Sequence, residues 1–78
     1  MAKDLNWAAK ILLELAKIPV QPSLIAAFSN YDENRMWIKG IIKSAATAAG
    51  AMSNPYYQQA LEILAANGID VNIYDTGS

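Results

Sequence analysis

The chain has 78 residues, of which 54% are hydrophobic, and its formal net charge is −1. It contains no cysteine and no histidine, which excludes disulfide bonds, thiolate chemistry, and the commonest general base and neutral metal ligand. A charge near zero gives the whole chain no general attraction to nucleic acid or to anionic membranes, and no apolar run reaches the roughly 18–20 residues that span a bilayer. We therefore expect one domain, residues 1–78, in a cytoplasmic protein that binds no cofactor, metal or membrane.

The first predicted element is a helix over residues 4–18, with Asp4 as its N-cap and Pro19 as its stop. Its polar residues form one narrow stripe, and nearly all its other residues are apolar. A helix that is apolar around most of its circumference needs cover on several sides. We expect this helix at the centre of the domain or at a subunit interface.

Two further helices are predicted over residues 22–29 and 31–52. Pro22 suits the first turn of the shorter helix. Asn30 precedes the longer helix, and Glu33 three residues later makes the start resemble a capping box. Bulky apolar residues fill the first half of this long helix, and small residues fill the second.

Small residues recur at every fourth position of the long helix, at Gly40, Ser44 and Ala48. Gly40 costs roughly 1 kcal/mol of helix propensity relative to alanine, so a packing benefit is expected in return. A row without bulky side chains lets another backbone approach closely. We expect either another helix of the domain or the same helix of a second copy to lie against this row. In the first half of the same helix, Met36 and its neighbours supply apolar bulk.

The fourth helix is predicted over residues 54–67, because Asn54 and Pro55 match an N-cap followed by the first helical position. Gly68 and Ile69 predict a Schellman ending, with Gly68 left-handed and Ile69 packed back on the helix.

Apolar and polar residues alternate along the tail, residues 69–75, as they do in a β-strand. A strand here would pair with a second copy or with a partner's sheet edge. The alternative is an extended tail whose apolar residues cover the helices. The predicted fold class is therefore all-α: a small four-helix domain with a C-terminal extended segment or a single β-strand.

Candidate protein-binding residues are the two tryptophans, for which core packing is the alternative, and the aromatic and apolar residues near the C-terminus. They are Trp7, Trp37, Tyr56, Tyr57, Val71, Ile73 and Tyr74.

Basic residues suggest a second kind of contact, with phosphates or with an acidic protein surface. Arg35, Lys39 and Lys43 are spaced by four and share one face of the long helix. Lys10 and Lys17 are seven residues apart on the first helix, as are Lys3 and Lys10, so the two stripes could merge if the helices lie side by side. Two separate solvated faces are the plainer interpretation.

No arrangement of a nucleophile with a base, no glycine-rich phosphate loop and no metal-ligand spacing is present, so we do not expect an enzyme. The preferred function is a non-enzymatic protein-binding module that associates with itself and with an unknown protein. Small size suggests an adaptor or a small inhibitor of a larger protein, such as phages encode. The alternative is association with nucleic acid through the lysine and arginine stripes.

Overall fold

The computed structural model describes residues 4–48 and 54–72, and all its regular elements are helices. The helices are α1 (Leu5–Leu15), α2 (Pro22–Ala27), α3 (Tyr31–Ala48) and α4 (Pro55–Ala66). The all-α prediction is confirmed, and no strand occurs among the described residues. No helix in this described part is long and apolar enough to cross a membrane.

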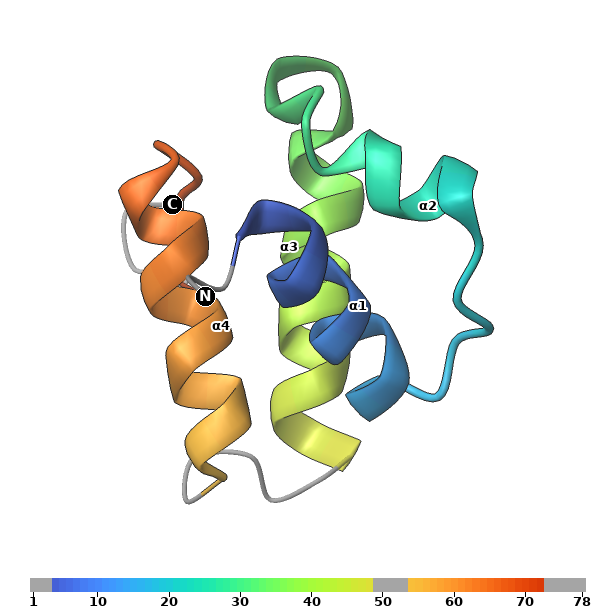
Figure 1. The fold of residues 1–78 in the computed structure, drawn as a ribbon, viewed down its shortest axis with the longest axis vertical. Coiled ribbons are helices and arrows are strands. Elements are labelled where there is room, and N and C mark those ends of the chain that lie inside the picture. Colours follow the sequence, from blue (N-terminus) through green and yellow to red (C-terminus); the bar gives the residue numbers. More distant parts are fainter. Residues whose placement is uncertain (1–3, 49–53, 73–78) are drawn as a thin grey trace.

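The centre of the domain is occupied by α1. It lies across α3 and α4, which run in opposite directions, and α2 projects to one side (Figure 1). Most contacts between helices are made by α1, with α4, with α3 and with α2. The chain's own helices therefore cover the side of α1 that carries Ala8, Ala9, Leu12 and Leu13, whereas Ile11 and Leu15 remain partly exposed.

The hydrophobic core takes residues from every long helix and from the segments that follow α2 and α4. Its buried members are Ala8, Ala9, Leu12, Leu13, Phe28, Ile38, Ile41, Ile42, Ala45, Tyr57, Ala60, Leu64 and Ile69. The residues that α1 buries completely are two alanines followed one turn later by two leucines: Ala8, Ala9, Leu12 and Leu13. The alanines leave room for neighbouring helices to approach, and the leucines fill the core.

The helix α1 ends at Leu15, three residues before the predicted end at residue 18. Lys17 takes a left-handed conformation, with φ at 64°. Its N–H donates to the Glu14 carbonyl at 3.1 Å, and the Ile18 N–H donates to the Leu13 carbonyl at 3.0 Å. These two bonds make a Schellman motif, which ends the helix before Pro19 can.

The start of α3 is built differently from the predicted capping box. Asn34 leaves helical geometry, with φ −116° and ψ 20°, which kinks the first turn. Its side-chain Nδ2 donates to the carbonyls of Ala27 at 3.2 Å and Asn30 at 3.0 Å. The acceptor in Asn30 is its backbone carbonyl and not its side chain, and this carbonyl also accepts from the Glu33 N–H at 3.1 Å. Asn34 therefore ties the end of α2 to the beginning of α3.

The helix α4 begins and ends with the predicted capping residues. The Asn54 side chain accepts from the Tyr56 N–H at 2.8 Å. At the other end Gly68 is left-handed, with φ at 81°, and the Ile69 N–H donates to the Leu64 carbonyl at 3.0 Å. Ile69 is buried, as the Schellman prediction requires.

The tail is described only as far as Asn72, and this part forms no strand. The Asp70 N–H donates to the Tyr31 hydroxyl at 3.3 Å, and the Asn72 N–H donates to the Asp70 carboxylate at 3.0 Å. The first residues of the tail are thus folded against the beginning of α3.

Candidate functional site

The outer face of α3 carries the most exposed large apolar side chain described. Met36 is 78% exposed, whereas Ile38, Ile41, Ile42 and Ala45 of the same helix are buried. The apolar bulk predicted for Met36 therefore lies on the surface and not in the core. A helix turns by about 100° per residue, so the side that buries these four residues leaves Met36 pointing outward.

No side chain or backbone of the described chain packs against Gly40. A Cβ atom built on Gly40 meets no described atom within 4 Å apart from the adjoining residues and the nearby backbone of its own helix. Gly40 lies one turn after Met36, and Ser44 and Ala48 continue the same row. Gly40, Ser44 and Ala48 are all exposed. The predicted close neighbour of this small-residue row is therefore not provided by the described part of the chain.

Two adjacent hollows follow this row. One, of about 530 Å³, is lined by Ala16, Gly40, Lys43, Ser44, Thr47 and Ala48. The other, of about 240 Å³, is lined by Met36, Lys39, Gly40 and Lys43. Because the hollows share Gly40 and Lys43, they form one shallow depression, which we call the α3 groove.

One edge of the α3 groove is basic. Lys39 and Lys43 line it, and Arg35 precedes them by one turn in the same row. We call Arg35, Lys39 and Lys43 the basic ridge. No acidic residue of α3 follows Arg35, because both acids of this helix, Asp32 and Glu33, lie in its first turn.

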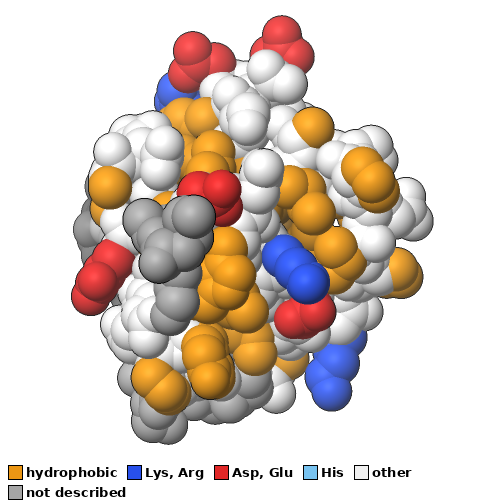
Figure 2. All heavy atoms as spheres, in the orientation of Figure 1, with side chains coloured by type: hydrophobic (Ala, Val, Ile, Leu, Met, Phe, Trp, Pro, Cys, Tyr) orange, Lys and Arg blue, Asp and Glu red, His pale blue; other side chains and the backbone are white. Residues whose placement is uncertain are grey.

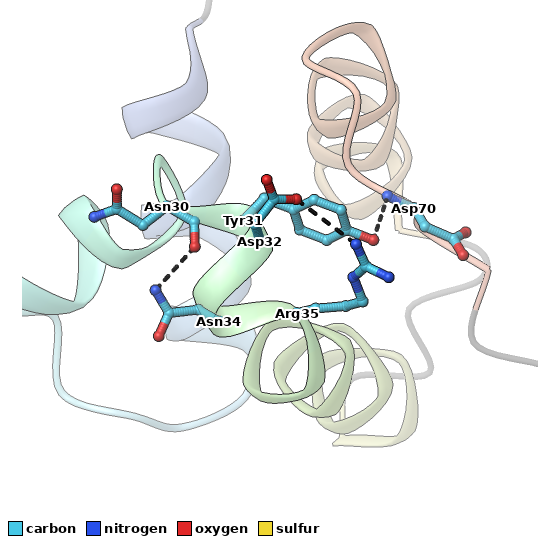
Figure 3. Close-up of polar contacts among 6 residues, drawn as sticks. All are labelled: Asn30, Tyr31, Asp32, Asn34, Arg35 and Asp70. Carbon is cyan, nitrogen blue, oxygen red and sulfur yellow. Dashed lines mark hydrogen bonds and ion pairs between the residues drawn. The ribbon is translucent and has the colours of Figure 1, made fainter.

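Arg35 is held at the beginning of α3. Its guanidinium lies 3.6 Å from the Asp32 carboxylate and 5.2 Å from the centre of the Tyr31 ring. Figure 3 shows Tyr31 between this guanidinium and the backbone of Asp70. Both partners of the ion pair are largely exposed, so it adds little to stability. Lys39 and Lys43 are the basic residues that line the groove itself.

The basic stripe expected on the first helix does not continue to its predicted end. Lys17 lies beyond the end of α1 and has left-handed backbone geometry, so helical spacing no longer relates it to Lys10. Lys3 lies outside the described residues. The basic ridge of α3 is therefore considered by itself.

The predicted protein-binding residues are scattered. Trp7 is half-buried against the core, and so is Trp37, whose ring meets the Phe28 ring edge-on at 5.5 Å. Tyr57 is 1% exposed and belongs to the core, so it has no surface to offer a partner. Tyr56, by contrast, is 55% exposed.

The tail residues among these predictions are only partly described. Val71 is half-buried and packs against the core, which agrees with a tail that covers the helices. Ile73 and Tyr74 lie outside the described residues. The structure therefore does not bring the predicted protein-binding residues together into one surface.

Apolar side chains also gather in a band where α1 lies beside α4 (Figure 2). Partly buried residues of these helices, including Ile11, Leu15 and Leu61, pack against the core from outside. Unlike the α3 groove, this surface is the outer layer of the core itself.

A third feature is a polar hollow of about 450 Å³ between the start of α3 and the end of α4. Its lining includes Tyr31, Asp32, Glu33, Asn67 and Gly68. Two carboxylates without a third metal-ligating residue do not make a metal site, and no cluster of three such residues occurs among the residues described. Tyr31, which lines this hollow, accepts a hydrogen bond from the Asp70 N–H of the tail.

Sequence reasoning identified the small-residue row and the basic ridge but not that they border one open groove. The signal that could have found it is the pair Met36 and Gly40, which lies opposite the buried isoleucines and begins the row that Ser44 and Ala48 continue. No protein family model, curated protein or solved structure matches the chain.

Proposed function

We propose that this protein is a non-enzymatic protein-binding module that receives its partner in the α3 groove. The observation that carries the proposal is Gly40. A glycine inside a helix costs roughly 1 kcal/mol relative to alanine, and nothing in the described chain uses the space above it. A partner that packs closely against Gly40 would supply the missing benefit.

Met36 supports the same proposal. An exposed methionine has three rotatable bonds and a polarisable sulfur, so it adapts to an apolar partner surface. Met36 lies at one end of the groove, where it offers a partner an apolar contact next to the small-residue row that begins at Gly40. The remaining groove residues are short, so their contact with a partner would cost little side-chain entropy.

Self-association is one form of this proposal, in which the groove of one copy receives a helix of another. The α3 groove is one face for it, and the partly exposed apolar side chains of α1 beside α4 are another. A different protein is the other form, and an adaptor or a small inhibitor of a larger protein, such as phages encode, would act in this way. Light scattering coupled to size exclusion separates the two, since a strict monomer at high concentration contradicts self-association.

Nucleic-acid association is the second candidate, favoured by the two lysines that line one groove. Asp32 and Glu33 at the start of α3 would repel phosphates from that end, and Arg35 is paired with Asp32. Reversing the charges of Arg35, Lys39 and Lys43 would abolish such binding.

The test of the proposed function uses substitutions that fill the groove without harming the fold. Gly40→Ala and Gly40→Gln have room for their first side-chain atom and raise helix propensity. We expect both variants to unfold at the same or a higher temperature than the unchanged chain. In a pull-down from lysate of the cells that encode the protein, we expect Gly40→Gln to retain fewer proteins than the unchanged chain. Ala65→Gln, on the exposed side of α4, is the matched control. Equal retention by Gly40→Gln and the unchanged chain would contradict the proposal.

A further inference from the structure

We propose that residues 70–72 form a strap that opens and closes against Tyr31 while the four helices stay folded. The proposal concerns the tail that follows α4, and it is independent of the α3 groove. In the closed form the strap joins the end of α4 to the beginning of α3, whereas most contacts between helices are made by α1.

Tyr31 is the fixed half of this device. Its ring is half-buried against the core, and the Arg35 guanidinium lies 5.2 Å from the centre of the ring. Asn34, three residues further along, ties the same part of α3 to the Ala27 carbonyl at the end of α2. The Tyr31 hydroxyl is therefore held in one place, where the Asp70 N–H meets it (Figure 3).

The strap is the moving half. Ile69, just before it, is 4% exposed, and its N–H closes the Schellman motif at the end of α4. Asp70 and Asn72 are exposed, by contrast, and Val71 is half-buried. The bond from the Asp70 N–H to the tyrosine hydroxyl is exposed, and at 3.3 Å it is longer than most N–H···O bonds. Segments with few buried apolar contacts and exposed hydrogen bonds open locally at low free energy, so the division between the fixed and the moving part falls after Ile69.

The closed strap occupies two backbone donors of the tail. In an extended segment the N–H groups of residues 70 and 72 point toward the same edge, so a neighbouring strand would need both of them. In the structure the Asp70 N–H donates to the Tyr31 hydroxyl, and the Asn72 N–H donates to the Asp70 carboxylate at 3.0 Å. The contact is therefore autoinhibitory, because it withholds this alternating segment from strand pairing. Opening and extension of the strap restore both donors.

Native-state hydrogen exchange of the purified full chain, followed by NMR at increasing urea concentration, tests the strap. The Asp70 amide should exchange through a local opening whose rate urea hardly changes, because little surface is exposed. The Ile42 amide, on the buried face of α3, should exchange faster as urea rises, because its release requires unfolding. An Asp70 amide with the same urea dependence as Ile42 would overturn the proposal, and so would one without any protection.

Tyr31→Phe removes the hydroxyl and keeps the ring. The Asp70 amide should then exchange about two- to tenfold faster, as expected for the loss of one hydrogen bond, while circular dichroism shows the helices intact. Tyr56→Phe is the matched control, since it removes a tyrosine hydroxyl from the exposed side of α4 and should leave the Asp70 rate unchanged. Equal Asp70 rates in Tyr31→Phe and the unchanged chain would show that Tyr31 does not close the strap, which would overturn the proposal.

Asp70→Ala tests the second donor. This change removes the carboxylate that accepts from the Asn72 N–H, so the Asn72 amide should exchange about two- to tenfold faster. An unchanged Asn72 rate would overturn the autoinhibitory contact, because the strap would then withhold the first donor alone.

Discussion

The two faces of α3 differ in how far the rest of the chain explains them. On the inner face Ile38 and Ile42 are fully buried, and their size is accounted for by α1 and the core. On the outer face Met36 is 78% exposed and Gly40 has open space above it. Neither outer residue stabilises the fold as a solvated helix surface would. The inner face is therefore explained by folding, whereas the outer face is not.

The inner face gives the largest expected effect. Ile42→Ala removes a fully buried side chain and should lower the free energy of unfolding by about 2–4 kcal/mol, measured by urea denaturation. The matched outer change is Met36→Ala, which should alter stability by less than about 0.5 kcal/mol because the side chain is mostly in water already. Similar losses for the two variants would contradict the division between the faces.

The next largest loss of stability is expected at the beginning of α3, because Asn34 fixes the orientation of this helix relative to the end of α2. Asn34→Ala removes the hydrogen bonds to the carbonyls of Ala27 and Asn30. Each bond contributes about 0.5–1.5 kcal/mol, and the better helix propensity of alanine offsets part of the loss, so we expect a net destabilisation of about 1 kcal/mol. Asn34→Asp is the control, since it keeps the size but cannot donate. Unchanged stability in both variants would show that the kink does not depend on this side chain.

Much of this division was predictable from the sequence, and the unpredicted parts have specific causes. The four-residue spacing of Gly40, Ser44 and Ala48 correctly indicated one face. Spacing cannot say whether a neighbour covers that face, because covering depends on where α1 and α4 lie. Met36 was predicted only to supply apolar bulk, and its outward position follows from the phase of the helix that buries the isoleucines.

The helix ends show a second limit of sequence reasoning. Gly68 was predicted to be left-handed because glycine adopts that conformation without cost. Lys17 adopts it too, with φ at 64°, in the same hydrogen-bonded motif. Lysine has no preference for the left-handed conformation, so the sequence did not predict it at Lys17. The end of α1 was therefore predicted from Pro19. The end of α1 is made by these local hydrogen bonds, and Ile18, which follows Lys17, packs against the core.

The outer face of α3 gives a smaller effect of opposite sign. Gly40→Ala should raise the free energy of unfolding by about 0.5–1 kcal/mol, since the new methyl group meets no atom within 4 Å and the helix gains propensity. Thermal unfolding followed by circular dichroism measures this change. A destabilised Gly40→Ala variant would show that the chain itself occupies the space above Gly40, and the α3 groove would then have no vacant floor.

The smallest effect is expected at the acidic start of α3, where Asp32 meets Arg35. Asp32→Asn removes an exposed ion pair with a separation of 3.6 Å, so stability should fall by no more than about 0.5 kcal/mol. Urea denaturation measures this change. Glu33→Gln, which removes a neighbouring acid without breaking the pair, is the matched control. A loss well above about 0.5 kcal/mol in Asp32→Asn alone would show that the ion pair stabilises the start of α3 more than its exposure predicts.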